Sequence, residues 1–507
     1  MAEMKHYTLG EYVKLLEEKG MLAEYDLQGK DGEEIKLLTY DSREVTQGTL
    51  FICKGAAFKA EYLKNSMNQG AVCYVSEKKY ELEKEVPYIL VKGIRDAMAV
   101  LANFFYNKPW EDLAVIGFGG TKGKSTSTYY MKAVVDDYLA AQDKPESAVI
   151  STIDIYDGKS KVESHITTPE AVELQMHLRN ALDCNIEYAE MEISSQALKY
   201  GRVDEMQFDV SVFLNISEDH ISPIEHPDFE DYFQSKMKMF EKSKTAVVNL
   251  DADYIDQILE ASKVAGEVVT FSTKNPEADY YAYNIHKEGK DIHFSVKCEA
   301  FDEEFVLTMP GFFNVENALG VVAASVKLGI PTEYIHSGLR RARSSGRMEF
   351  YHSKDHEIMA IVDYAHNKLS FEKLFSAMKE EFPDYGLVAI FGCPGKKSLL
   401  RRKYLGTIAG QYSKMVYLVA EDPGYEPVED ISKEIAQYVE AQKCPYKMIE
   451  DRGEAIKDAI ETAEGKTLLL VTGKGAETRQ KYGCEYLDCP SDVEYVQRYL
   501  AEYDSRH

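Results

Sequence analysis

The chain has 507 residues, of which 45% are hydrophobic and 28% are charged, a composition typical of folded globular proteins. This length is sufficient for about three domains. The formal net charge of −26 at pH 7 argues against nucleic acid as the main partner, because the phosphate backbone attracts basic surfaces. Small anionic substrates are not excluded, since a local basic cluster can oppose the global charge.

No stretch of about 18 or more apolar residues occurs in the chain, so we expect no membrane span. The first residues, MAEMKHYTLGEY, lack the apolar core that a secretion signal requires, and we expect a cytoplasmic protein. The eight cysteines are scattered and no pair has CxxC spacing. We therefore expect buried free thiols rather than zinc ligands or disulfides. We also expect a monomer.

Residues 1–107 have the pattern of a small α/β domain. An amphipathic helix is predicted first, followed by four strands: Leu9–Lys19, then Ile35–Thr39, Thr49–Lys54, Ala71–Ser76 and Tyr88–Val91. Ser42 follows the end of the first strand and Gly55 follows the second. Polar loops at strand ends are where open α/β sheets bind ligands, although ordinary turn chemistry explains Asp41-Ser42-Arg43 equally well.

Residues 113–126, LAVIGFGGTKGKST, have the layout of a phosphate-binding loop. A short apolar strand leads into four glycines, then Lys124, Ser125, Thr126 and a predicted helix over Tyr129–Leu139. Glycine-rich backbone and a helix N-terminus present N–H groups to an anion, and the lysine reaches the terminal phosphates. The strict pattern G-x-x-x-x-G-K-[ST] requires glycine at the position of Phe118, so this loop is a variant.

The rest of the region 108–345 alternates strand with helix. Further strands are predicted at Ala148–Ile153, Tyr188–Ile193, Val210–Leu214 and Thr245–Leu250, which indicates a doubly wound sheet with right-handed crossovers. A basic run, Arg340-Arg341-Ala342-Arg343, lies near its end. Residues 346–507 form a third α/β segment, with strands predicted at Met359–Val362, Gly386–Phe391, Met415–Val419 and Thr467–Val471.

Three places on the predicted central sheet offer candidate ligands for a divalent cation that accompanies a nucleoside triphosphate. They are Ser125, Glu192 at the carboxyl end of its strand, and the Asp219-His220 pair. A glutamate at a strand end is more often a solvated loop residue unless a phosphate loop lies beside it. Thr167-Thr168-Pro169-Glu170 is typical of a helix N-terminus, with threonine caps, proline in the first turn and free N–H groups that also suit an anion.

The segment EHPDFEDYFQSKMKMFE predicts a helix with a buried aromatic face. Lys236 follows Tyr232 by four residues and Phe233 by three, so it shares that face, whereas Lys238 does not. A bare ammonium on an apolar face is costly. Either the side chain snorkels to solvent, or the lysine is kept for chemistry or modified to a carbamate.

These features, taken in chain order, resemble the Mur ligases, the ATP-dependent amide-forming enzymes of peptidoglycan assembly. The motifs that carry the resemblance are GTKGKST, TTPE, MEISSQAL with Gly201-Arg202, FLNISEDH, SK at Lys236, GFFNVENAL, GRME, VDYAH and TGKGAE. Nine motifs in order at family-like spacing make the resemblance specific, and it covers nearly the whole chain. It is greatest to members that add the third amino acid, to UDP-N-acetylmuramoyl-L-alanyl-D-glutamate.

The resemblance implies a three-domain α/β fold. The domains would be a uridine-nucleotide domain (1–107), a central ATP-binding domain with the P-loop in a doubly wound sheet (108–345) and a C-terminal Rossmann-like domain (346–507). It implies ATP and Mg²⁺ as cofactors. Nucleotide contacts would come from Gly120, Thr121, Lys122, Gly123, Lys124, Ser125, Thr126, Asn314, Arg347 and Asp363, and muramyl-peptide contacts from Ser42, Thr167, Thr168, Ser194 and Arg202.

The resemblance also implies how the reaction is catalysed. Ser125, Glu192, His220 and a carbamylated Lys236 would lie around the metal, and Lys124, Glu192, His220 and Lys236 would be the catalytic residues. ATP would convert a peptide carboxylate to an acyl phosphate, which an amine then attacks. Lys124 and magnesium would offset the charge on the transferring phosphoryl group.

The residue that is added would be read by Glu421-Asp422-Pro423-Gly424, with Gly473 and Glu477 nearby. Diaminopimelate-adding members carry D-N-P-R here, whose arginine can hold a second carboxylate, whereas Gly424 cannot. Glu421 and Asp422 favour an amino acid with a side-chain ammonium, L-lysine first and ornithine next, and meso-diaminopimelate is not excluded. A folylpolyglutamate synthase and a catalytically silent nucleotide-binding scaffold are competing hypotheses for the whole chain.

Overall fold

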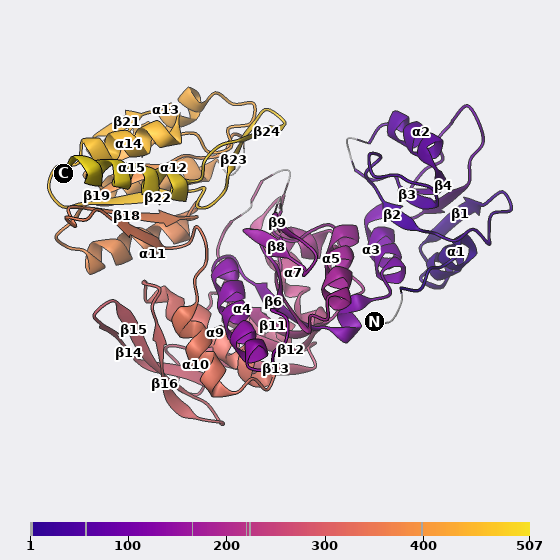
Figure 1. Cartoon of the computed structure of the whole chain (residues 1–507), viewed down its shortest axis with the longest axis horizontal. Coiled ribbons are helices and arrows are strands. Elements are labelled where there is room, and N and C mark those ends of the chain that lie inside the picture. Colours follow the sequence, from indigo (N-terminus) through magenta and orange to yellow (C-terminus); the bar gives the residue numbers. More distant parts are fainter. Residues whose placement is uncertain (1–3, 56–57, 165, 220, 223–224, 397–398) are drawn as a thin grey trace.

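The computed structural model describes residues 4–507 except 56–57, 165, 220, 223–224 and 397–398. Figure 1 shows three α/β units in chain order, with the N-terminal and C-terminal units on opposite sides of the central one. This agrees with the α/β fold class predicted above. No helix among the described residues is long and apolar enough to cross a membrane.

The N-terminal unit is one sheet with three helices. Its strand order is β1-β5-β4-β3-β2, with only β1 antiparallel to its neighbour. The four predicted strands and the first helix are present. The elements are α1 (Leu9–Glu18), β1 (Leu22–Asp26), β2 (Leu37–Thr39), β3 (Thr49–Ile52), α2 (Ala60–Gln69), β4 (Ala71–Ser76), β5 (Tyr88–Val91) and α3 (Ile94–Phe105).

The central sheet has the strand order β16-β15-β14-β13-β12-β11-β6-β10-β7-β8-β9. Its middle, from β14 to β7, is parallel, and both edges are antiparallel. Its strands are β6 (Ala114–Gly119), β7 (Ala148–Ile150), β8 (Asp154–Tyr156), β9 (Lys161–Glu163), β10 (Tyr188–Glu192), β11 (Phe208–Phe213), β12 (Ser243–Asn249), β13 (Glu267–Ser272), β14 (Tyr280–Glu288), β15 (Asp291–Lys297) and β16 (Asp302–Leu307).

Helices pack on both faces of this sheet, as a doubly wound fold requires. The apolar residues of α4 and α9 form one core with β6 and β11, whereas those of α5 and α7 form a second core. The helices are η1 (Pro109–Asp112), α4 (Lys124–Ala140), α5 (Ala171–Asp183), α6 (Ser195–Lys199), α7 (Phe229–Met237), η2 (Phe240–Lys242), α8 (Ile255–Ser262), α9 (Phe313–Lys327) and α10 (Thr332–Arg341).

The C-terminal unit has the strand order β17-β18-β22-β19-β20-β21, in which only β17 is antiparallel, and a separate hairpin of β23 and β24. Its elements are β17 (Glu349–His352), β18 (Ile358–Asp363), α11 (Lys368–Glu381), β19 (Gly386–Phe391), α12 (Leu400–Tyr412), β20 (Met415–Leu418), α13 (Val428–Ala441), β21 (Tyr446–Met448), α14 (Arg452–Glu461), β22 (Thr467–Thr472), β23 (Arg479–Tyr482), β24 (Glu485–Asp488) and α15 (Asp492–Arg506).

Two local predictions were wrong. The helix after the glycine loop begins at Lys124 rather than Tyr129, because the loop itself supplies the first turn. The threonines of TTPE do not cap a helix, since α5 begins at Ala171 and its N-cap is Glu170, which makes no side-chain capping bond. All eight cysteines are free thiols, but only four of them are buried, and Cys484 is exposed.

A buried carboxyl on β10 gives the stability of the fold a testable pH dependence. Glu190 is fully buried, and burial raises its pKa to about 8, against the opposing effect of Lys132. A carboxyl with a raised pKa in the folded state stabilises the fold below its unfolded pKa, and this contribution is lost as pH rises toward 8. Glu190→Gln should therefore stabilise the protein by roughly 1 to 3 kcal/mol at pH 8 and far less at pH 5.

Thermal unfolding of both proteins at pH 5, 6.5 and 8 checks this expectation. Glu241→Gln is the matched control, since Glu241 is exposed and should show no pH-dependent change. An equal loss of stability in Glu190→Gln at all three pH values would contradict it.

Candidate active site

The glycine loop joins β6 to α4, as the sequence predicts for a phosphate-binding loop. Gly120 and Gly123 have φ of 132° and 86°, which residues with a Cβ rarely adopt. Phe118 is a residue of β6, and its side chain is fully buried in the core. This explains the departure from the general motif, because position 118 still belongs to the strand and the turn begins only at Gly120.

The loop is held in place by two asparagines from other elements. Asn215, just after β11, accepts a hydrogen bond from the N–H of Lys122 (2.9 Å) and donates one to the Lys122 carbonyl (3.0 Å). Asn317 on α9 lies so close that a Cβ on Gly123 would be 2.2 Å from its Oδ1. Glycine at 123 is therefore required both by its φ and by this contact.

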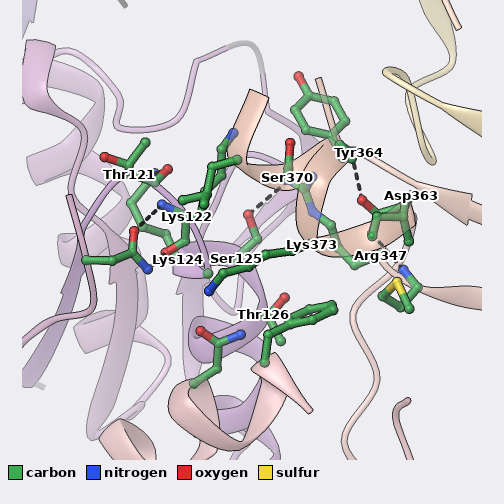
Figure 2. Close-up of a pocket in the computed structure, with 18 of the residues that line it drawn as sticks. Thr121, Lys122, Lys124, Ser125, Thr126, Arg347, Asp363, Tyr364, Ser370 and Lys373 are labelled. Carbon is green, nitrogen blue, oxygen red and sulfur yellow. Dashed lines mark hydrogen bonds between the residues drawn. The ribbon is translucent and has the colours of Figure 1, made fainter. Parts of the chain in front are cut away.

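Cationic side chains from three parts of the chain converge on this loop. Lys124 Nζ donates to the carbonyls of Gly120 and Thr121, each at 3.1 Å. Lys236 Nζ on α7 donates to the same Gly120 carbonyl at 2.7 Å. Arg347, which precedes β17, donates from Nη2 to Ser125 Oγ at 3.1 Å. Figure 2 shows Lys124, Ser125 and Arg347 around one cavity.

Burial and the repulsion between neighbouring cations lower the pKa values of three lysines at the loop. The pKa of Lys122 falls to about 7 because of burial, although Asp219 opposes the shift from 3.7 Å. The pKa of Lys124 is lowered and that of Lys236 is far below its usual value, in both cases mainly by burial. A bound polyanion would relieve this concentrated positive charge, so the site is suited to phosphate groups.

The cavity beside the loop has a volume of about 240 Å³. Most of the residues predicted to bind nucleotide or metal line it. They are Thr121, Lys122, Gly123, Lys124, Ser125, Thr126, Glu192, Arg347 and Asp363, joined by Thr152, Thr167, Asn215, Phe313, Glu316, Asn317, Met348, Tyr364, Ala365, His366, Leu369, Ser370, Lys373 and Leu374. Figure 2 shows Ser370 and Lys373 of α11 facing Ser125 across this cavity.

Asn314 does not line the cavity. Its side chain is buried, donates to the Pro310 carbonyl at 2.7 Å and accepts a hydrogen bond from Asn317 at 3.1 Å. Asn317 is the residue of the pair that faces the loop. It was not predicted from the sequence, although the repeated asparagine in Asn314-x-x-Asn317 places both on one side of a helix.

Glu192 lies at the carboxyl end of β10, inside the cavity. It accepts hydrogen bonds from the N–H of Thr152 (2.8 Å) and from Thr152 Oγ1 (3.2 Å). Thr168 Oγ1 donates to the Glu192 carbonyl (2.8 Å) and accepts from the N–H of Ser194 (3.0 Å). Thr168 therefore ties the TTPE loop to the end of β10, and Thr167 accepts from Thr152 Oγ1 at 3.3 Å, so neither caps α5.

An ion-pair network joins the N-terminal and central units. Lys54, after β3, lies 2.7 Å from Glu170, which lies 2.8 Å from Arg202. Arg202 also donates to the Thr168 carbonyl at 3.1 Å. Ser42 lies in the half-buried loop between β2 and β3. Thr168 and Arg202, two of the residues predicted to bind the muramyl substrate, thus meet at this junction.

Lys236 lies on the buried face of α7, as the spacing predicts. It is 3% exposed, its Nζ is 4.9 Å from the centre of the Tyr232 ring, and Lys238 is exposed. Asp228 caps the helix by accepting from the N–H of Asp231. His220 lies outside the described residues, so its predicted place near the metal stays a prediction.

A second cavity, of about 370 Å³, lies in the C-terminal unit. Five of the six residues predicted to read the amino acid line it, and Pro423 does not: the five are Glu421, Asp422, Gly424, Gly473 and Glu477. Gly424 is fastened to the β23–β24 hairpin, because its N–H donates to the Lys481 carbonyl (3.0 Å) and its carbonyl accepts from the N–H of Gly483 (2.7 Å).

The carboxylates of this second cavity are not equivalent. Asp422 accepts from Lys474 Nζ at 3.1 Å, and Lys474 also pairs with Glu477. Glu421 is 7% exposed, and its Oε2 has no hydrogen-bond partner among the described residues. Burial raises the pKa of Glu421 to about 8, against the effect of Arg452. Glu421 is therefore the acid that most needs a cation from a ligand.

Tyr364 and His366 line both cavities. His366 Nδ1 lies 2.7 Å from the Tyr364 carbonyl. A carbonyl only accepts, so Nδ1 carries the proton. Burial, Lys122 and Arg401 hold the pKa of His366 well below its usual value, so the imidazole is neutral at pH 7. The phosphate cavity and the second cavity thus share a wall that can accept a proton at Nε2.

The low pKa of Lys122 predicts proton uptake when a polyanion binds. Phosphate groups favour the ammonium form, so binding of ADP should raise the pKa of Lys122 and draw protons from the buffer at pH 7.5. Calorimetric titrations in buffers of different ionisation enthalpy measure this uptake. We expect Lys122→Met to reduce it, while Lys159→Met, an exposed control, leaves it unchanged. Equal uptake in Lys122→Met and the wild type would contradict the assignment.

Comparison with known proteins places the whole arrangement in one family. Residues 119–325 match the Mur ligase middle domain and residues 346–475 match the Mur ligase, glutamate ligase domain. The UDP-N-acetylmuramoyl-L-alanyl-D-glutamate–L-lysine ligase of Enterococcus faecalis is 38% identical over 88% of each chain. The UDP-N-acetylmuramyl-tripeptide synthetase of Lactobacillus acidophilus is 31% identical over 98% of each chain.

A solved UDP-N-acetylmuramoyl-L-alanyl-D-glutamate–2,6-diaminopimelate ligase has the same fold, with a TM-score of 0.66 over 99% of this chain and 100% of that one, at 22% identity. The glycine loop, the cations that surround it and the second cavity, which we call the acidic pocket, agree with these matches. The chain belongs to the Mur ligase family.

Proposed function

We propose that the chain is an ATP-dependent ligase that adds L-lysine to the D-glutamate carboxylate of UDP-N-acetylmuramoyl-L-alanyl-D-glutamate, in the synthesis of peptidoglycan precursor. The observation that carries the proposal is the wall of Tyr364 and His366 shared by the phosphate cavity and the acidic pocket. A phosphorylated carboxylate made on one side of this wall is within reach of an amine held on the other. The names of the relatives support the same reaction.

The residue roles follow the positions of the side chains. Gly120 to Thr126 and Arg347 would bind the triphosphate, and Asp363 with the residues of α9 and α11 would hold the nucleoside. Lys54, Arg202 and the loops that carry Ser42, Thr167, Thr168 and Ser194 would bind the UDP-muramyl peptide. We further propose three domains over 1–107, 108–345 and 346–507, and a monomer that works in the cytoplasm.

Magnesium fits the oxygen donors around the loop. Ser125 Oγ and the Glu192 carboxylate line the same cavity as the loop. Among the residues that the structure describes, no group of three or more His, Cys, Asp or Glu side chains is arranged to hold a metal. Few protein ligands of oxygen type suit Mg²⁺, which keeps waters and phosphate oxygens. When bound through Ser125, Glu192 and His220, it would offset charge on the transferring phosphoryl group.

Lys236 is suited to carbamylation. A carbamate forms from a neutral amine, and burial holds the pKa of Lys236 far below its usual value. Its Nζ reaches the Gly120 carbonyl, so a carboxylate at that position would stand beside the phosphate loop. The modification would replace one of the crowded cations with an anion.

The chain's own groups then account for the two chemical steps. Lys124 and Arg347 orient the terminal phosphate toward the substrate carboxylate and stabilise the charge that develops on it. The carboxylate oxygen takes up the terminal phosphoryl group, and ADP leaves. The amine of the amino acid then attacks the acyl phosphate, its carbon–oxygen bond breaks, and phosphate leaves. The neutral Nε2 of His366, at the shared wall, is placed to hold the proton that the amine releases.

We expect the acidic pocket to favour a side-chain ammonium over a second carboxylate, although Lys396, Arg401 and Lys481 line it as well. Lys474 pairs with both Asp422 and Glu477, so Asp422 contributes less to this preference than its sequence motif suggests. Glu421 keeps an unpaired buried oxygen, and Gly424 has no side chain to hold a second carboxylate. The lysine assignment therefore rests on Glu421 and on the relatives.

A screen of amino acids tests this selectivity. Phosphate release from ATP should require both UDP-N-acetylmuramoyl-L-alanyl-D-glutamate and an amino acid, with kcat/KM at least ten-fold higher for L-lysine than for ornithine or meso-diaminopimelate. Glu421→Gln should raise the KM for lysine, because its ammonium loses a buried counter-charge. A clear preference for meso-diaminopimelate would refute the role of Gly424, and release with a folate substrate would favour a folylpolyglutamate synthase.

Substitution of Lys236 tests the carbamate. Lys236→Ala should lower kcat by at least 100-fold, because the loop loses a charged group that touches it. Lys238→Ala, on the exposed side of the same helix, is the control and should retain full activity. Short carboxylic acids should restore part of the activity of Lys236→Ala. Unchanged turnover in Lys236→Ala would refute the role, whereas no turnover in the wild type would favour a silent scaffold.

A further inference from the structure

A third cavity, of about 500 Å³, lies away from the phosphate loop and the acidic pocket. It is enclosed by the β14–β15 hairpin, the segment after β16, the segment before β17, the strands β17 and β18, and the end of α11. Figure 1 shows this hairpin of the central unit below α11 of the C-terminal unit. Its volume is in the range of small-molecule sites, roughly 300 to 1,000 Å³.

The walls of this cavity are largely apolar. Met309 and Met348 are buried, and Phe350, Met359 and Phe382 pack partly buried against the main core. Such walls favour a ligand with an apolar body of matching size.

One buried polar atom in the lining is unsatisfied. Ser344 is 1% exposed, and its Oγ has no hydrogen-bond partner among the described residues. A buried hydroxyl without a partner costs free energy, and a hydrogen-bonding ligand group would remove this cost.

The cationic lining is also only partly neutralised. Arg343 belongs to the basic run of the sequence, to which the ligase reaction gives no role. Its Nη1 contacts Thr308 Oγ1 (2.6 Å) and the Ala342 carbonyl (2.7 Å). Within the described part of the chain, neither Arg343 nor Lys290 has an acidic partner within 4 Å, whereas Lys287 pairs with Glu381 at 3.1 Å.

The acidic lining residues are engaged elsewhere. Glu381 is paired with Lys287, and Glu349 accepts from the N–H of Gly346 and from Tyr351 OH. The cavity therefore combines an apolar interior with uncompensated positive charge in a protein whose net charge is −26. This combination selects a ligand with both an apolar body and an anionic head.

We propose that this third cavity is a ligand site that binds an amphiphilic anion: an apolar ring system or acyl chain that carries one phosphate, sulfonate or carboxylate. The apolar body lies against Met309, Met348 and Phe382, and the anionic head is held by Arg343 and the Ser344 hydroxyl. Binding of this anion does not require the ligase reaction or its substrates.

The position of the cavity couples it to the phosphate loop. Arg347 and Met348 line both this cavity and the phosphate cavity. An anion in the third cavity and the phosphates of a nucleotide would both interact with the positive charge of Arg347. Each ligand should therefore lower the affinity of the other by a limited factor.

The experiment uses the full chain and the fluorescent probe 8-anilinonaphthalene-1-sulfonate, which has an apolar ring system and one sulfonate. We expect saturable binding, displaced by dodecyl phosphate below its micelle concentration. Dodecanol, which lacks the head, and inorganic phosphate, which lacks the body, should need at least ten-fold higher concentrations. If dodecanol displaced the probe as effectively as dodecyl phosphate does, the requirement for an anionic head would be refuted.

Two variants locate the probe. Arg343→Gln should weaken its binding by at least five-fold, and Met309→Trp, which fills the cavity, should abolish it. Arg340→Gln, from the same basic run but outside the lining, is the matched control. Thermal unfolding shows whether Met309→Trp folds, and Arg343→Gln is decisive if it does not. Equal probe affinity in Arg343→Gln and Arg340→Gln would overturn the site.

Added ADP tests whether the probe binds in this cavity or in the phosphate cavity. We expect ADP to lower probe affinity by no more than about ten-fold, with an effect that levels off as ADP saturates, as coupling between two sites requires. Displacement that continues without limit would place the probe in the phosphate cavity and would overturn the proposal.

Discussion

The Gly120 carbonyl accepts hydrogen bonds from two ammonium groups, those of Lys124 and Lys236, and the structure around the active site depends on this crowding. Lys122 and Arg347 add two further cations at the same cavity. Buried cations repel one another and lose their hydration, which is why the pKa values of the three lysines are lowered. These cations need an anion for electrostatic balance, and a triphosphate supplies the required charge.

This requirement explains why distant segments converge. Lys236 comes from α7, Arg347 from the segment between the central and C-terminal sheets, and Asp363 from the end of β18. Arg347 and Asp363 reach the loop because the C-terminal unit lies beside it, whereas Lys236 belongs to the same unit as the loop. A ligand that binds these groups therefore holds two units of the protein together, and the shared wall of Tyr364 and His366 then joins the phosphate cavity to the acidic pocket.

The charge that the acidic pocket offers to a ligand depends on residues that are distant in the sequence. The motif EDPG suggests that two carboxylates bind one ammonium of the ligand. However, Lys474, from a loop after β22, forms ion pairs with Asp422 and Glu477. Among the described acids that line this pocket, Glu421 is the one with an unpaired buried oxygen. The β23–β24 hairpin closes over Gly424 through two backbone hydrogen bonds, so the loop presents its backbone rather than a side chain.

Local sequence patterns were sufficient to predict the parallel strands, the glycine loop and the buried face of α7. Buried parallel strands are continuous apolar runs, and Lys236 shares the spacing of Tyr232 and Phe233. The same patterns did not reveal edge strands such as β8, β9 and β14 to β16, because half-exposed antiparallel strands alternate apolar with polar residues and lack such runs.

Which side chains meet was settled by tertiary packing alone. Asn317 rather than Asn314 faces the loop because of the rotation of α9, and Thr168 of TTPE binds the end of β10 because β10 lies beside it. The low pKa of Lys122 depends on burial by residues far away in the chain. These properties arise from contacts between distant segments, and a one-dimensional pattern records only the residues that each segment brings.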